Sequence, residues 1–104
     1  MPEGMFELTS FQRDLLVIAA EKERPSGQDI KDEIEATYDT EITHGRLYPN
    51  LDTLAEKGYI EKGRIDRRTN FYEVNERGYG ALRDQRAWQD EYLEAAESEV
   101  IPHS

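Results

Sequence analysis

Residues 43–54 read Thr43-His44-Gly45-Arg46-Leu47-Tyr48-Pro49-Asn50-Leu51-Asp52-Thr53-Leu54. Leu47, Leu51 and Leu54 recur at helical spacing, which marks the buried side of a helix. Thr43 is a favourable N-cap for this helix, and Gly58 is a favourable stop shortly after it. Pro49 predicts a local kink rather than a helix end, because the leucine spacing continues past it.

The side of this helix away from the leucines has an unusual composition. Its centre carries Gly45, Pro49 and Thr53, which offer little to a packing partner and leave room for a nucleic acid to approach. The flanking positions are Arg46 and Asn50 on one side and His44 and Tyr48 on the other. This surface predicts a DNA-reading helix whose exposed N-terminal part enters the major groove.

The flanking side chains suit different parts of DNA. Arg46 can pair bidentately with guanine and Asn50 with adenine, and we expect the Tyr48 hydroxyl to reach a phosphate. His44 is expected to hydrogen-bond at the helix start or to a phosphate, since no second metal ligand lies near it in the sequence. The alternative is that Arg46 is a solvated surface cation and contacts no base.

A basic hairpin is predicted directly after this helix. Ile60 to Ile65 and Phe71 to Val74 have the composition of strands, and the polar segment 66–70 between them favours a turn. Such a wing would grip phosphates or enter the minor groove, although a basic turn is often simply solvated. The predicted DNA-contacting residues are therefore Thr43, His44, Gly45, Arg46, Tyr48, Pro49, Asn50, Thr53, Lys62, Arg64, Arg67, Arg68 and Thr69.

Capping signals place the remaining helices. Thr9 with Gln12 forms a capping box before the first helix, and Ser26 begins the second, with Asp29 at its third position. Asn75 is a good N-cap for a last helix that runs towards Val100. About 25 residues span roughly 37 Å at 1.5 Å per residue, which is longer than one small domain needs.

The order helix–helix–helix–strand–strand–long helix, together with particular residues, resembles the PadR family of winged helix-turn-helix transcription regulators. The resemblance covers about residues 9–95 and is most specific in its Leu-Tyr-Pro-x-Leu core. The matching residues are Gly45-Arg46-Leu47-Tyr48-Pro49-Asn50-Leu51-Asp52-Thr53-Leu54, Lys57-Gly58-Tyr59-Ile60, Arg67-Arg68-Thr69-Asn70-Phe71-Tyr72 and Val74-Asn75-Glu76-Arg77-Gly78. Asn75 departs from the threonine usual in the family, but it should still cap a helix.

The resemblance implies a mainly α protein with a small β-hairpin (α+β). It predicts a tail over residues 1–8, a winged-helix DNA-binding domain over 9–76, and a C-terminal dimerisation helix and tail over 77–104. The long helix carries aromatic and apolar residues for which a single domain has little further use. The expected dimer interface comprises Phe11, Leu82, Trp88, Tyr92, Leu93 and Ala96, although packing against the chain's own first helix is an alternative.

The charge distribution bears on the partner and the surroundings. Acidic residues outnumber basic ones by 23 to 13, for a net charge of −10, which by itself argues against DNA. Residues 44–78, however, carry 7 basic and 6 acidic side chains and so escape this bias. Diffuse acidity with few lysines resembles the proteins of salt-loving archaea, and the match looks like the haloarchaeal branch of the family. An ordinary acidic protein is the alternative.

Several classes are disfavoured by composition. The chain has no cysteine, which excludes disulfides and thiol-based redox sensing. The sequence shows no secretory signal and no run of about 20 apolar residues, so we expect a cytoplasmic protein without a membrane association. With two histidines, no glycine-rich phosphate loop and no spaced ligand set, it offers neither an enzyme site nor a metal or cofactor site.

The sequence thus predicts a homodimeric, sequence-specific regulator of transcription that binds double-stranded DNA at a palindromic operator. The family branch suggests a stress response, oxidative stress among the candidates, in a high-salt cytoplasm with salt ions bound at the DNA interface. The rival prediction is a winged helix that serves as a protein-interaction module without direct DNA readout.

Overall fold

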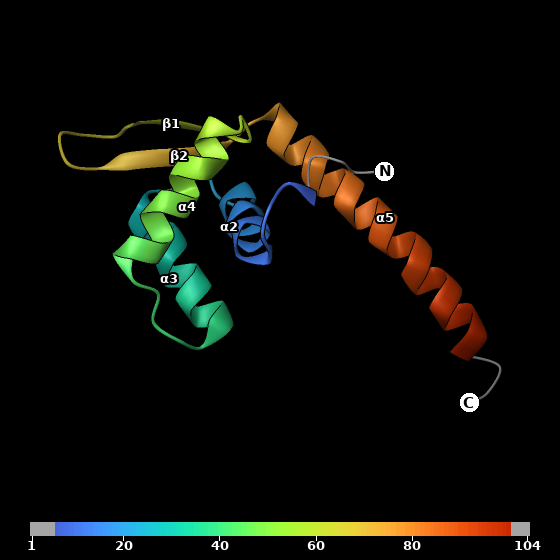
Figure 1. Cartoon of the computed structure of the whole chain (residues 1–104). Helices are drawn as coiled ribbons and strands as arrows, with labels where there is room; N and C mark the ends of the chain where they lie inside the picture. The colour runs from blue at the N-terminus through green and yellow to red at the C-terminus, as the bar shows by residue number, and fades with distance from the viewer. Residues whose placement is uncertain (1–5, 101–104) are drawn as a thin grey trace.

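The computed structural model describes residues 6–100 and is mainly helical with one hairpin, as the sequence predicted (Figure 1). The fold class expected from the sequence is therefore confirmed. The elements are α2 (Ser10–Ala20), α3 (Gly27–Tyr38), α4 (His44–Glu56), β1 (Ile60–Arg64), β2 (Asn70–Val74) and α5 (Glu76–Val100).

The predicted helix caps are present. The Thr9 hydroxyl accepts a hydrogen bond from the backbone N–H of Gln12, and the Gln12 side chain accepts one from the backbone N–H of Thr9, both at 3.1 Å. Ser26 caps α3 in the same reciprocal way. The Thr43 hydroxyl accepts from the backbone N–H of Arg46 at 3.2 Å and so caps α4. These local bonds fix where each helix begins.

The hydrophobic core lies among α2, α3, α4 and the hairpin. Leu47, Leu51 and Leu54 of α4 are completely buried, as their spacing predicted. They share this core with residues of α2, α3 and the strands, and with Leu8, which belongs to the segment expected to be a tail. Because the leucine side of α4 is used entirely for packing, the opposite side must face outwards.

The two strands form an antiparallel pair with Ile60 opposite Val74 and Arg64 opposite Asn70. The first strand ends one residue earlier than predicted, and the second begins one residue earlier. The reason is that the backbone N–H of Ile65 donates to the carbonyl of Thr69 at 2.8 Å and belongs to the turn. The backbone N–H of Tyr72 donates to the carbonyl of Pro25 at 2.8 Å, which attaches the hairpin to the α2–α3 linker.

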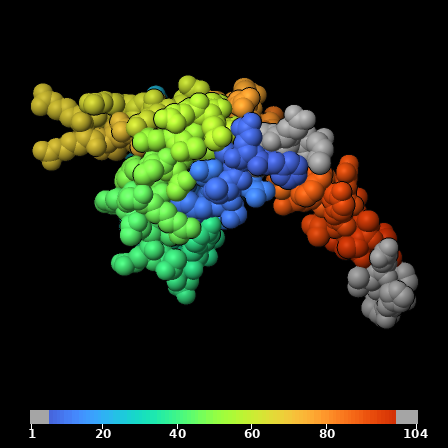
Figure 2. Space-filling model, viewed as in Figure 1, coloured from blue at the N-terminus to red at the C-terminus, as the bar shows by residue number. Residues whose placement is uncertain are grey.

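Helix α5 begins on the domain and then leaves it. The Asn75 side chain accepts from the backbone N–H of Gly78 at 2.9 Å, and the Tyr79 hydroxyl donates to the carbonyl of Ala20 at 3.1 Å. Beyond this contact α5 projects as an arm at the opposite end from the hairpin tip (Figures 1 and 2). Tyr92 and Leu93 on the arm are 64% and 57% exposed. Among residues 6–100, no helix is long and apolar enough to cross a membrane.

Candidate nucleic-acid interface

The N-terminal turns of α4 form an open surface. Thr43, His44, Gly45 and Arg46 are exposed, and so is Pro49 one turn later. A Cβ atom added at Gly45 would meet no heavy atom within 4 Å. An exposed, uncrowded helix start of this kind can approach a large ligand closely.

The side of α4 that carries Arg46 and Asn50 packs against α2. The Arg46 guanidinium lies over the ring of Phe11, 4.0 Å from its centroid. Asn50 donates from Nδ2 to the carbonyl of Arg46 at 2.7 Å, and its Oδ1 accepts from Nε2 of Gln12 at 2.9 Å. Asn50 was expected to be available for adenine. Its amide oxygen and its amide nitrogen are instead both hydrogen-bonded within the chain. A bidentate contact to adenine would therefore require breaking these bonds.

The other flank is more buried. Tyr48 is half-buried and lies so close to Gly27 that a Cβ there would come within 2.5 Å of the ring atom Cε1. His44 meets the edge of the Tyr48 ring, with centroids 5.5 Å apart. On the same helix, the Thr53 hydroxyl donates to the carbonyl of Pro49 at 3.0 Å. The absence of a side chain at Gly27 therefore determines where Tyr48 sits.

The hairpin tip is shaped by a residue whose role the sequence analysis missed. Asp66 Oδ1 accepts from the backbone N–H groups of Arg68 and Thr69 at 2.9 and 3.0 Å. These bonds hold the pKa of the Asp66 carboxyl below its ordinary value. Arg64, Arg67 and Arg68 are exposed around this turn. The sequence signal for this role was an aspartate followed by polar residues. An aspartate side chain in such a segment can close a turn by accepting hydrogen bonds from backbone N–H groups further along the chain.

Lys62 forms an ion pair with a residue of α4. Its Nζ lies 2.8 Å from Oδ1 of Asp52, and this hydrogen bond raises the pKa of Lys62. The same ammonium lies 5.8 Å from the centroid of the Tyr72 ring. Lys62 was expected to be a free cation of the wing. In this structure it links the wing to α4, so a phosphate would have to compete with Asp52 for it.

A cleft of about 330 Å³ lies between the start of α3, α4 and the hairpin. The sequence had not assigned the start of α3 to the site, although Ser26 was visible as a cap. The N-terminus of a helix attracts anions because its N–H groups point outwards. The lining residues are Ser26, Gly27, Gln28, Tyr48, Asp52, Lys62, Arg68, Thr69, Asn70 and Tyr72.

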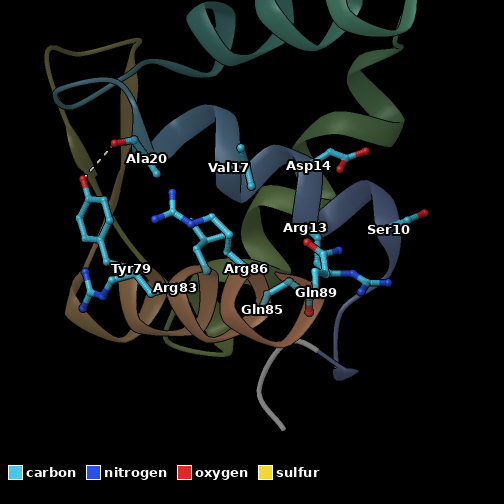
Figure 3. A pocket seen from close by; sticks show the side chains of 11 residues that line it. Ser10, Arg13, Asp14, Val17, Ala20, Tyr79, Arg83, Gln85, Arg86 and Gln89 are labelled. Carbon is cyan, nitrogen blue, oxygen red and sulfur yellow. Dashed lines mark hydrogen bonds between the residues drawn. The ribbon is translucent and has the colours of Figure 1, made fainter. Parts of the chain in front are cut away.

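A second, larger groove of about 850 Å³ lies between α2 and α5 (Figure 3). Arg13 of α2 and Arg83 and Arg86 of α5 line it, and Val17 on its α2 side is 55% exposed. Nε of Arg13 and Oε1 of Gln85 are buried there and make no hydrogen bond within residues 6–100. Buried polar groups of this kind are usually paired by protein or by water.

The residues expected at a dimer interface fall into two groups. Phe11 is only 6% exposed and belongs to the core beneath Arg46, so it has little surface to offer a second chain, and Leu82 is partly buried against the core. On the arm of α5, the Trp88 ring lies 5.4 Å from that of Phe6 and 5.2 Å from that of Tyr92. Leu93 and Ala96 are exposed further along the arm.

These elements define a winged helix-turn-helix protein, with α4 as the second helix of the motif and the hairpin as the wing. No group of three or more possible metal ligands occurs in the part of the chain that the structure describes. The chain belongs to the PadR-like family of transcriptional regulators, whose profile matches residues 15–84. It is therefore a transcriptional regulator of this class.

Solved structures support the assignment. H. salinarum RosR is 37% identical, with a TM-score of 0.80 over 95% of this chain and 96% of that one. A RosR complex, hsRosR-S4, is also 37% identical, with a TM-score of 0.83 over 97% and 93% of the two chains. A PadR-like transcription factor from Bacteroides fragilis shares the fold at 17% identity, with a TM-score of 0.72 over 85% and 87%. No curated protein sequence matches the chain.

Proposed function

We propose that this regulator binds double-stranded DNA sequence-specifically, with α4 in the major groove and the wing on the backbone. The observation that carries the proposal is the open N-terminal surface of α4, where Gly45 leaves room and Arg46 presents a cation. In a chain with a net charge of −10, the hairpin adds the exposed arginines Arg64, Arg67 and Arg68, and Arg68 lines the same cleft as Tyr48 of α4. A helix of this kind reads base edges, and flanking cations fix its register on the phosphates.

The direct test is selection of binding sequences from random duplexes of about 30 base pairs at about 2 M KCl. Wild type and Arg46→Ala are carried through in parallel. We expect wild type to enrich a palindrome and Arg46→Ala to lose preference at one position of each half-site. Failure of folded wild type to enrich any sequence would refute sequence-specific binding.

The wing distinguishes this proposal from its rival, a winged helix that only binds other proteins. Measured below molar salt, replacing both Arg67 and Arg68 by alanine should weaken DNA binding and reduce the salt dependence by roughly one phosphate contact per residue. Lys57→Ala, an exposed cation at the far end of α4, is the matched control. Unchanged DNA affinity and salt dependence in the double variant would contradict the role of the wing on the backbone, and a folded wild type without DNA affinity would favour the protein-interaction module.

We further propose that the protein acts as a homodimer built on α5. The arm exposes Tyr92 and Leu93. It also carries the carboxylates Asp90, Glu91, Glu94 and Glu97, whereas the α2–α5 groove carries three arginines against one carboxylate, that of Asp14. Figure 3 shows Arg86 extending into that groove. The arm of one copy therefore complements the groove of the other in charge and in apolar surface, and a two-fold dimer would match a palindromic operator.

Charge reversal tests this pairing. Arg83→Glu with Arg86→Glu in one variant, and Glu91→Arg with Glu94→Arg in another, should each weaken self-association in sedimentation experiments. A mixture of the two should restore a dimer, because the reversed charges again face opposite charges. If both variants remain dimeric alone, the pairing of arm and groove is incorrect.

Salt sets a further condition on the proposed site. Each neutralised phosphate lowers affinity with a log–log slope of about −0.9 as salt rises, so an acidic protein in molar KCl cannot rely on that attraction. We propose that base and shape readout dominate in a haloarchaeal, high-salt cytoplasm, and that acidic side chains near the DNA hold salt cations at the interface. A steep negative salt slope between 1 and 2 M KCl would contradict this.

The proposed biological role is a stress response, with oxidative stress as the first to test, in line with the similarity to RosR. Because the chain has no cysteine, a thiol in this chain cannot be the sensor. Comparing transcription between a deletion strain and its parent before and after peroxide tests the role. An identical transcriptional response in the two strains would refute it.

A further inference from the structure

Phe11 stands at the start of α2, directly beneath the reading helix. One side of its ring carries the Arg46 guanidinium at 4.0 Å, and the Tyr38 ring lies at 6.0 Å with an interplanar angle of 59°. The Tyr38 hydroxyl in turn donates to Oδ2 of Asp14 at 2.5 Å, which holds the Tyr38 ring in place. Arg46 therefore rests on a fixed platform although it is exposed to solvent.

Gln12, the next residue of α2, makes a second link to α4. It is only 8% exposed, and its amide oxygen and amide nitrogen make hydrogen bonds to different residues. Oε1 accepts from the backbone N–H of Thr9 at 3.1 Å, and Nε2 donates to Oδ1 of Asn50 at 2.9 Å. Asn50 Nδ2 then donates to the carbonyl of Arg46 at 2.7 Å. A continuous chain of hydrogen bonds thus runs from the N-cap of α2 to the backbone of Arg46.

We propose that Phe11 and Gln12 are positioning residues for DNA readout, which preset Arg46 for a base contact and commit Asn50 to orienting it. The inference rests on the proposed DNA binding and concerns the same site. A guanidinium held over an aromatic ring can still direct N–H donors to guanine, because the cation–π contact uses none of them as hydrogen-bond donors. The long side chain is then partly ordered before DNA arrives, so less freedom is lost on binding.

Asn50 acquires a different role from the one that its residue type suggests. Bidentate recognition of adenine uses both the amide oxygen and the amide nitrogen. Here the oxygen serves Gln12 and the nitrogen serves the Arg46 carbonyl. The geometry therefore assigns sequence discrimination to Arg46, with Asn50 as the link that transmits the position of α2 to it.

The test compares discrimination at the base pair that the Arg46→Ala selection identifies. For each variant, the affinity for the enriched operator is divided by the affinity for the same duplex changed at that base pair. Phe11→Leu removes the ring, and Gln12→Ala removes the bond to Asn50. Thr9→Ala is the control, because it removes one capping bond of α2 but leaves the Gln12–Asn50 bond.

We expect Phe11→Leu to lower this ratio by about two- to thirtyfold, the range that a cation–π contact spans, while affinity for unrelated DNA changes little. Gln12→Ala should also lower the affinity ratio, whereas Thr9→Ala and Phe11→Tyr should leave it unchanged. A purely structural role would instead weaken binding to both duplexes equally. If Phe11→Leu does not fold, the comparison of the affinity ratios of Gln12→Ala and Thr9→Ala tests the proposal.

Failure of this inference is distinguishable from failure of the proposed function. If wild type discriminates between the duplexes and both variants discriminate equally well, Phe11 and Gln12 do not position the reading residues, and the DNA-binding proposal stands. If folded wild type shows no discrimination at all, the proposed sequence-specific binding fails and this assignment fails with it.

Discussion

Two glycines in the first turns of α5 make a matched pair for testing how the helix is seated. A Cβ at Gly78 would lie 2.4 Å from the carbonyl oxygen of Tyr59 and 2.7 Å from Cγ1 of Val74. A Cβ at Gly80, two residues later, would meet nothing within 4 Å. The substitutions Gly78→Ala and Gly80→Ala therefore add the same methyl group to the same helix in opposite surroundings.

The magnitudes follow from two terms. Alanine is better than glycine in a helix by up to about 1 kcal/mol, and this gain is largely common to both variants. Overpacking at Gly78 costs about 1–3 kcal/mol, because a backbone carbonyl cannot rotate away as a side chain can. We expect Gly80→Ala to stabilise the protein by about 0.5–1 kcal/mol and Gly78→Ala to fall below it by about 1–3 kcal/mol.

Urea unfolding followed by circular dichroism measures the difference. Both variants and wild type are compared at one salt and one protein concentration, because dimerisation would make the stability depend on concentration. In thermal unfolding the two variants should differ by at least about 4 °C. If Gly78→Ala is as stable as Gly80→Ala, the close seating of α5 on the carbonyl of Tyr59 is wrong.

Three further substitutions test local features. Asn75→Ala should lower the free energy of unfolding by about 1–2 kcal/mol, since Asn75 caps α5 and also donates to the carbonyl of Gly58 at 2.8 Å. In denaturant titrations, Asn75→Thr should recover only the part of this loss that is due to capping. Thr43→Ala should cost about 1 kcal/mol in the same assay, and no loss would contradict its capping role. The hydrogen bond from the backbone N–H of Ile42, followed by the one from Lys31, lowers the pKa of the Glu35 carboxyl. The ionised Glu35 therefore stabilises the fold at pH values above the ordinary carboxyl pKa. Glu35→Gln should therefore lower Tm at neutral pH, with a gap that closes as pH falls through the acidic range, and a constant gap would contradict this.

Local patterns explain why much of the fold could be predicted. Leu47, Leu51 and Leu54 are completely buried because residues three and four apart share one side of a helix. Thr9 and Ser26 cap their helices through bonds to groups three residues away, which any sequence of that type can form. The hairpin bounds were off by a single residue at each strand because the turn chemistry of residues 65–69 was not read in detail.

The candidate site was predictable as a set of residues but not as an arrangement. The exposure of Gly45 and Arg46 followed from their place opposite the leucines. The pairing of Lys62 with Asp52 was not foreseen, because each residue was considered only on its own element. The participation of Gly27 in placing Tyr48 was also missed, since nothing in the sequence says which helix start faces α4.

By itself the sequence determined the helices, the hairpin and the length of α5, because those depend on periodicity and capping over short distances. The family followed from the resemblance of particular residues, above all the Leu-Tyr-Pro-x-Leu core, and not from those periodicities. Only the tertiary structure decided that Arg46 rests on Phe11, and that Gln12 and Asn50, 38 residues apart, share a hydrogen bond. The three-dimensional packing of α2 against α4 sets these contacts. A side chain's partner depends on which elements meet and at what angle, and no local pattern encodes that.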